Sequence, residues 1–275
     1  MKWINSADLA VPYYTFENIE HSSAAICGFT TRIYRKDGAE DDFFQPLLRA
    51  DSDPAAVAAC RKLLSDQFGA DPERVVRSAQ KHTANIHKVT ESDLGPAGNR
   101  NDFESIDGLI TDLPGVMLQT FGADCPSVYL LDPEHRAIGL CHSGRKGTQY
   151  HIAGKMLEQM TLEYGTDPGT VLAAISPGIC MDCYEVGDDV AQEFLRDYHQ
   201  WEDLPEPAVI MNGRYHLDLN AAIAGTLMKK GVPVSQIETS GLCTRCRNDR
   251  FYSFRAQGCI TNENCAFLML KDRSK

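Results

Sequence analysis

Two apolar segments joined by a short polar turn lie in the middle of the chain, and they constrain the fold more than any other feature. Residues 127–132 (SVYLLD) and 136–141 (RAIGLC) flank a turn at residues 132–135 (DPEH). Apolar runs on either side of a Pro-containing polar turn are typical of a β-hairpin. The sequence therefore predicts an antiparallel hairpin at the centre of the fold.

Other segments predict the elements around this hairpin. Further strands are expected at residues 108–113, 116–121 and 171–175, and residues 91–106 are expected to form a polar loop. Capping residues, a first-position Pro and terminal Gly residues predict four helices, at Pro54–Phe68, Thr148–Tyr164, Asp188–His199 and from about Asp218 to Gly231. Hairpin-like strands with helices outside them indicate an α+β fold, in one domain spanning residues 1–275.

Composition narrows the class of partner. The net charge is −11 over 275 residues, and no basic block is present, which disfavours nucleic acid and anionic membranes as partners.

The N-terminus lacks the pattern of a signal peptide, and no segment reaches the roughly 18 apolar residues of a membrane span. We therefore expect a soluble, cytoplasmic protein, in which the ten cysteines are metal ligands, catalytic groups or buried thiols rather than disulfides.

The expected hairpin brings a thiol and an imidazole together. If Leu131 lies opposite Arg136, the same register places Cys125 opposite His142. Directly opposed side chains share a face, with Cβ atoms about 4.5–5.5 Å apart. Such a pair could chelate one ion, or it could act as a nucleophile and base dyad. The residues alone leave both interpretations open.

A third metal ligand could come from the segment SAQKHTANIHKV, which carries His82 and His87. Two His and one Cys with an open fourth position suit catalytic zinc. Each histidine could equally be an ordinary hydrogen-bonded residue, and Cys125 could be a buried thiol. Spacing alone does not choose between the two histidines.

A glycine-rich turn follows His142 and leads into a helix. Its sequence SGRKGT contains Gly144, Arg145 and Lys146. Free backbone N–H groups at a helix start, together with cationic side chains, favour an oxyanion such as phosphate. If the anion lies elsewhere, Arg32 and Arg255 are the next candidates.

Two CxxC pairs form a second candidate cluster, Cys180 with Cys183 and Cys243 with Cys246. Two such pairs often indicate structural zinc, with about 15–20 residues between them. The gap here is 60 residues, from 183 to 243. Buried thiols are therefore the expectation, with a structural zinc or a redox pair as alternatives.

Eight motifs occur together in a recognisable order. They are QKH (80–82), DGLIT (107–111), GADCPSVYLLD (122–132), CHSGRKGT (141–148), ISPGICMDCYEVGDDV (175–190), HLDL (216–219), GLCTRC (241–246) and FYSFR (251–255). From about Gly28 to the C-terminus the chain resembles the laccase-domain family, also called the YfiH/YlmD or polyphenol-oxidase-like family. The resemblance implies a sandwich of α/β/β/α type, with mixed sheets and helices outside them.

The resemblance also implies a function, because members of that family are regarded as purine nucleoside phosphorylases. The family's zinc ligands correspond to His82, Cys125 and His142, which selects His82 over His87. The implied reaction joins phosphate to C1′ of a nucleoside and releases the base and ribose 1-phosphate. The implied partners are thus a small nucleoside and phosphate. The resemblance also implies adenosine deamination as a side activity.

Further residues acquire candidate roles from the same motifs. Gln80 and Arg255 belong to two of them and are candidates for substrate contacts, and Asp124 is a candidate acid beside Cys125. Arg145-Lys146 replaces the family's Trp-Arg, and Ala256 replaces an Arg, so the phosphate contacts are expected to differ.

Two alternative functions remain. The family's older name implies a copper-dependent polyphenol oxidase, but no two histidines of this chain are two residues apart, as the HxH pairs of multicopper oxidases require. The second alternative is a cysteine hydrolase that uses the Cys125–His142 dyad.

Overall fold

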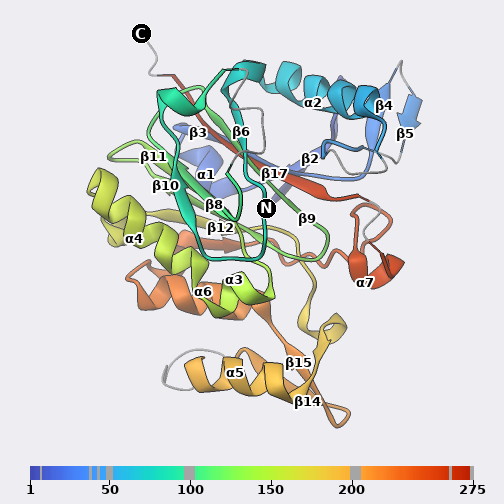
Figure 1. Cartoon of the computed structure of the whole chain (residues 1–275), viewed down its shortest axis with the longest axis vertical. Helices are drawn as coiled ribbons and strands as arrows, with labels where there is room; N and C mark the ends of the chain where they lie inside the picture. Colours follow the sequence, from blue (N-terminus) through green and yellow to red (C-terminus); the bar gives the residue numbers. More distant parts are fainter. Residues whose placement is uncertain are drawn as a thin grey trace.

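Two stacked β-sheets form the centre of the molecule, with helices on both outer faces (Figure 1). The computed structural model describes residues 1–6, 8–36, 39–41, 44–47, 52–95, 103–198, 206–259 and 262–272. The first sheet has the order β1 (Lys2–Ile4), β2 (Tyr13–Thr15), β3 (Ala25–Thr30), β17 (Asn264–Leu270), β9 (Met117–Gly122) and β6 (Val75–Arg77). The second has the order β16 (Ile237–Thr239), β12 (Leu172–Ile175), β10 (Ser127–Asp132), β11 (Ala137–His142), β8 (Gly108–Thr111) and β7 (Ile86–Lys88).

Both sheets are mixed, since β6 pairs with β9, β7 with β8 and β12 with β16 in parallel, while the central pairs are antiparallel. Smaller sheets contain β13 (Glu185–Val186), β15 (Arg214–Leu217) and β14 (Ala208–Met211), and β4 (Tyr34–Lys36) with β5 (Ala39–Asp41). The helices are α1 (Glu17–His21), α2 (Pro54–Phe68), α3 (Arg145–Gln149), α4 (Ile152–Tyr164), α5 (Asp188–Tyr198), α6 (Leu219–Lys229) and α7 (Phe254–Gln257).

Three apolar layers hold the two large sheets and the helices on them together. Leu118 of the first sheet and Tyr129 of the second are buried in the layer between the sheets. Met156 of α4 and Ile223 of α6 pack on the outer face of the second sheet, and Leu64 of α2 covers the first. Fully buried aliphatic and aromatic side chains of this kind each contribute about 1.5–3 kcal/mol. The expected mixed sandwich with helices outside is therefore confirmed, whereas one domain over residues 1–275 stays a prediction.

The hairpin register differs from the predicted one. Leu131 pairs with Ile138 rather than Arg136, and His142 pairs with Ser127 rather than Cys125. The predicted register was wrong because the turn lies one residue further along the chain. Cys125 consequently precedes β10, in the loop after β9.

The physical reason is the side chain of Asp132, which remains in the strand and shapes the turn. Its carboxylate accepts the backbone N–H groups of Glu134 and His135, at 2.9 and 3.0 Å. Arg136 then closes the turn in the left-handed region, with φ of 54°. The second strand begins at Ala137 as a result.

Helix predictions from capping residues are largely confirmed. Asp53 caps α2 through the N–H of Ala55, and Gly69 ends it with φ of 63°. The predicted helix at 148–164 is instead α3 followed by α4, because His151 adopts φ of 56° between them. The predicted end of the third helix at His199, and residues 96–102 of the predicted loop, lie outside the described residues.

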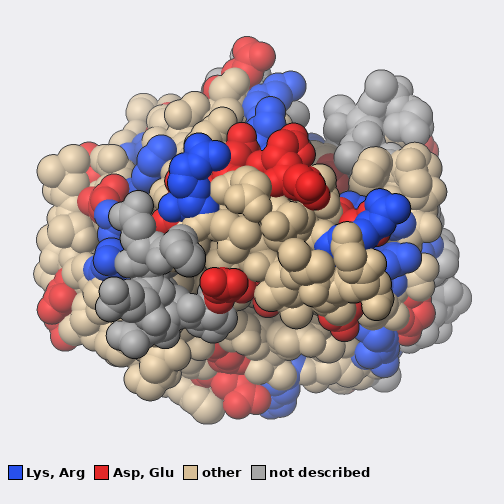
Figure 2. All heavy atoms as spheres, turned by 90° about the horizontal axis from the view of Figure 1, so that it is seen from below, with Lys and Arg blue, Asp and Glu red and all other residues tan. Residues whose placement is uncertain are grey.

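Charges of both signs share the surface. On the face shown in Figure 2, Lys and Arg side chains lie in small groups beside Asp and Glu side chains. Among the described residues, no helix is both long enough and apolar enough to cross a membrane.

Candidate active site

Three potential metal ligands converge from separate loops and one strand end. His82 lies between β6 and β7, Cys125 lies between β9 and β10, and His142 is the last residue of β11. Their ligand atoms all lie within 4.8 Å of one another. The two imidazoles are close to perpendicular, with ring centroids 4.9 Å apart. The structure thus brings together the three residues selected from the sequence. Cys125 reaches His142 from the loop before β10, however, and not from the opposite position in the hairpin.

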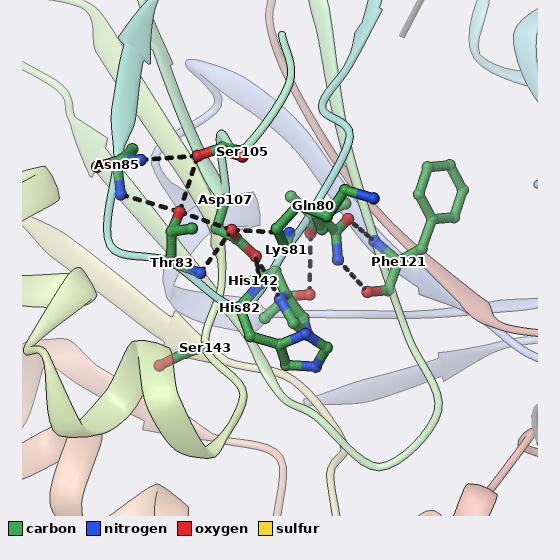
Figure 3. Close-up of polar contacts among 12 residues, drawn as sticks. Gln80, Lys81, His82, Thr83, Asn85, Ser105, Asp107, Phe121, His142 and Ser143 are labelled. Atoms are coloured by element: carbon green, nitrogen blue, oxygen red, sulfur yellow. Dashed lines mark hydrogen bonds and ion pairs between the residues drawn. The ribbon is translucent and has the colours of Figure 1, made fainter.

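Asp107, just before β8, fixes two of these ligands. Its carboxylate accepts the backbone N–H groups of Lys81, His82 and Thr83 at 2.8–3.1 Å. Oδ1 also lies 2.9 Å from Nδ1 of His142 (Figure 3). Because an ionised carboxylate can only accept, Nδ1 of His142 carries the proton. The other ring nitrogen, Nε2, is left as the metal-binding atom, as is usual for metal-ligating histidines.

The electrostatics follow from this geometry. Burial acts to raise the pKa of Asp107, but hydrogen bonds from His142 and the Thr83 backbone lower that pKa to about 2. Burial likewise acts to raise the pKa of Cys125, but the charge and hydrogen bonds of the two imidazoles lower it to about 7. Burial opposes protonation of His142, yet Cys125 and Asp107 together raise its pKa to about 10. Metal binding would need Cys125 as the thiolate and His142 as the neutral imidazole, so it would displace the proton from Nε2 of His142.

The space among these donors suits an ion. A Cβ added at Gly144 would lie 2.8 Å from Sγ of Cys125 and 2.9 Å from Cδ2 of His82. Glycine is therefore needed here for the close approach of the backbone to the ligands. Two imidazoles and one thiolate with a free fourth position match the donor set of catalytic zinc sites. The residues present fit such a metal.

A cavity of about 450 Å³ opens beside the three ligands. Its lining includes four cationic side chains, namely Lys81, Arg145, Lys146 and Arg255. It also includes the rings of Tyr184 and Phe254. The Arg255 guanidinium lies 5.3 Å from the centre of the Tyr184 ring. An acidic protein thus presents a cationic, partly aromatic cavity at the candidate metal centre.

Asp124 also lines this cavity, but both of its carboxylate oxygens accept hydrogen bonds from the protein. Its carboxylate accepts Oγ1–H of Thr244 and the backbone N–H of Arg255, both at 2.7 Å. The residue is buried and has φ of 90°, a strained conformation for a side chain other than glycine. These contacts favour a role in shaping the Cys125 loop over the predicted role as an acid.

Three other residues considered from the sequence lie around the site. Gln80 exchanges two hydrogen bonds with the backbone of Phe121, at 2.7 and 2.8 Å, and so ties the His82 loop to β9. Arg32 lies over the Tyr252 ring and donates to the Asn248 carbonyl, and it is not part of the cavity lining. His87 pairs with Asp93 at 3.2 Å and does not join the three ligands.

Sequence reasoning missed Asp107, Lys81 and Tyr184. The available signal for Asp107 was its position directly before a largely apolar strand, within the motif DGLIT. Lys81 sits between two residues that were selected, and Tyr184 follows the first CxxC pair. Their roles became visible only when the loops were placed together.

The fold and site together define an α/β sandwich protein with a three-ligand candidate metal centre beside a cationic cavity. The chain belongs to the family described as multi-copper polyphenol oxidoreductase laccase, whose model matches residues 27–271. The predicted resemblance is confirmed.

Named relatives agree in length and fold. The chain is 30% identical over 258 residues to purine nucleoside phosphorylase YlmD of Bacillus subtilis, covering 92% of this chain and 91% of that protein. It is 32% identical over 211 residues to adenosine deaminase RL5 of an unknown prokaryotic organism, covering 75% and 79%. The crystal structure of YlmD from Geobacillus stearothermophilus superposes with a TM-score of 0.87 at 30% identity, covering 98% and 99% of the two chains.

Proposed function

We propose that this chain is a cytoplasmic, zinc-dependent purine nucleoside phosphorylase. The substrates would be phosphate and adenosine, inosine or guanosine, and the products the free base and ribose 1-phosphate. The observation that carries this proposal is one cavity in which two of the three ligands, His82 and Cys125, lie with four cationic side chains and two aromatic rings. Relatives named as purine nucleoside phosphorylases support it.

The cationic side chains account for phosphate. Arg145, half-buried, and Lys146, exposed, follow the His142 turn, and Lys81 adjoins His82 within the same cavity. Their charges would hold a phosphate dianion and orient one oxygen toward C1′ of the ribose. The new bond joins that oxygen to C1′ while the bond from C1′ to N9 of the base breaks, and the base leaves with the electron pair and takes up a proton.

The rings of Tyr184 and Phe254 account for the purine, because planar bases stack on aromatic side chains. His82, Cys125 and His142 would hold the metal, with Asp107 keeping the imidazole of His142 in the binding tautomer. Zinc held by these residues would supply Lewis-acid polarisation. Excluding bulk water from the cavity would favour phosphate over water as the group that reaches C1′.

The phosphate assignment predicts the behaviour of an Arg145→Ala/Lys146→Ala variant. Each lost charged hydrogen bond is worth about 1.5–3 kcal/mol, so the KM for phosphate should rise roughly ten- to hundredfold per bond. Initial rates with inosine at varied phosphate, with ribose 1-phosphate as the detected product, measure this. Lys155→Ala, an exposed change on α4, is the matched control. An unchanged phosphate KM in the double variant would place the anion elsewhere.

Adenosine deamination is a second candidate activity, favoured by the relative named adenosine deaminase. Adenosine without phosphate should then yield inosine and ammonia. Incubation of one nucleoside with and without phosphate separates the two reactions by their products. Oxygen consumption with a phenol and copper, and no product from nucleosides, would instead support the copper oxidase alternative.

A further inference from the structure

The two CxxC pairs come together in space despite their 60-residue separation. The sulfur atoms of Cys180, Cys183, Cys243 and Cys246 all lie within 4.8 Å of one another. A parallel bridge joins Gly178, two residues before the first pair, to Cys243, the first residue of the second pair. The expectation of buried thiols holds for Cys243 but not for the other three, since Cys180 and Cys183 are half-buried and Cys246 is exposed.

Each pair forms a tight turn that points its sulfurs toward the other pair. The first is the short 3-10 helix Met181–Cys183, begun by Cys180. In the second, Sγ of Cys243 accepts the backbone N–H of Cys246 at 3.4 Å, and it also accepts the N–H of Cys180 at 3.3 Å. Backbone N–H groups directed at a sulfur stabilise a thiolate. One backbone N–H group from each pair is thus directed at the same sulfur, Sγ of Cys243.

The sulfur spacing fits a metal better than a disulfide. Zinc–sulfur bonds of about 2.3 Å in a tetrahedron place the sulfurs about 3.8 Å apart. Sγ of Cys183 and Sγ of Cys246 are 3.5 Å apart, whereas a disulfide bond is about 2.05 Å long. All four cysteines are free thiols. Four sulfurs within 4.8 Å of one another can supply every ligand of a closed, structural site.

We propose that these four cysteines bind one structural zinc ion, separate from the candidate catalytic centre. The guanidinium of Arg245, between the second pair, interacts with the Cys183 sulfur and offsets part of the negative charge of four thiolates. Zinc binds thiolate ligands and has no redox chemistry, which suits a site that only holds two chain segments together.

The site would hold the cavity wall in place. Ile179 and Tyr184, on either side of the first pair, line the cavity. Thr244, inside the second pair, donates to Asp124 beside Cys125, and the Asp124 carbonyl accepts the N–H of Ile179 at 2.8 Å. One ion would therefore lock two distant segments against the loop that carries Cys125.

Elemental analysis of the purified full-length chain and two double variants tests the proposal. His82→Ala/His142→Ala removes two ligands of the catalytic centre, and Cys183→Ser/Cys246→Ser removes two of the second site. Each double variant should retain about one zinc per chain, and the wild type about two. Cys259→Ser, at an exposed thiol, should keep both ions. Because the first variant lacks the catalytic centre, its zinc reports on the second site whatever reaction the enzyme performs.

Two further measurements use the His82→Ala/His142→Ala variant alone, so the result stands even if the cysteine variant fails to fold. Cobalt exchange should give the intense visible absorption of a tetrahedral four-thiolate site. Chelation should expose four additional thiols to a colorimetric thiol reagent. Any of three results would overturn the proposal. The variant could be metal-free with these thiols already reactive, it could hold a disulfide that appears only without reductant, or it could bind iron in place of zinc.

Discussion

At the scale of single residues, one carboxylate organises the candidate centre. Asp107 receives three successive backbone N–H groups and the Nδ1–H of His142, so it sets both the loop of one ligand and the tautomer of another. The family resemblance could select His82, Cys125 and His142 from the sequence. It could not assign Asp107 a role, because that role depends on contacts between residues 24 to 35 positions apart.

Replacing Asp107 with Asn should weaken metal binding about 10- to 100-fold, the usual loss when a partner behind a ligand is removed. The amide NH2 would face N–H donors and leave at least one of them unpaired. Competition with a chelator of known affinity measures the change. Asp112→Asn, at a nearby exposed carboxylate, is the control, and equal affinity in both variants would remove Asp107 from the site.

The reactivity of Cys125 separates a metal ligand from a catalytic nucleophile. A coordinated thiolate is shielded, so iodoacetamide should modify Cys125 slowly in the metallated protein and faster after chelation. Peptide mapping by mass spectrometry measures both rates, with the exposed Cys259 as the internal reference. Full activity after chelation, abolished by one equivalent of iodoacetamide, would instead support a hydrolase that uses His142 as the base.

At the scale of elements, local sequence signals predicted the ends of helices well and the pairing of strands less well. Asp53 and Gly69 marked both ends of α2, because caps act within a few residues of the helix. The hairpin register failed because Asp132 bonds forward into its own turn, a choice that apolar patterning does not reveal. The left-handed His151 between α3 and α4 is similarly invisible to periodicity.

The free energy of unfolding should depend on the charge of Asp132, because its carboxylate shapes the turn after β10. Burial acts to raise the pKa of this carboxyl, but hydrogen bonds from the backbone and side chain of His135 lower it. The stabilisation is therefore present above the unfolded pKa of about 3.9 and is lost as the pH falls through the lower folded pKa. Asp132→Asn should cost about 1–3 kcal/mol at neutral pH.

Urea unfolding at pH 7 and below pH 4 measures the effect. The difference in unfolding free energy between wild type and Asp132→Asn should shrink at the acidic pH, where the carboxylate is lost. Glu134→Gln, an exposed change in the same turn, should behave as wild type. A deficit that is the same at both pH values would show that the charge of Asp132 does not stabilise the turn.

At the scale of the whole molecule, the site exists because the two sheets are stacked. The loop of Cys125 leaves the first sheet and enters the second, while His142 ends the strand beside it. Apolar patterning predicts that helices cover sheets, but it does not say which strand ends meet. For the same reason the two CxxC pairs seemed too far apart in the sequence, although the fold joins them through the bridge at Gly178.

A buried hydrogen bond of Tyr129 links the two sheets across the apolar layer between them. The hydroxyl of Tyr129, on β10, donates to the Gly28 carbonyl on β3 at 2.8 Å, and the Tyr129 side chain is fully buried. Tyr129→Phe keeps the ring and its packing but leaves that carbonyl without its side-chain donor. The expected loss is about 1–3 kcal/mol, and each kcal/mol lowers the Tm by about 2–4 °C in a chain of this size.

Thermal unfolding followed by circular dichroism measures the Tm, with Tyr150→Phe, at a half-exposed ring (50%), as the matched control. Metal content should remain that of the wild type, because Tyr129 lies in the layer between the sheets and not among the ligands. Equal Tm values for the two variants would show that this hydrogen bond does not stabilise the stacked sheets. A lower Tm for Tyr129→Phe with unchanged metal content would show that this hydrogen bond stabilises the stacked sheets without contributing to the metal centre.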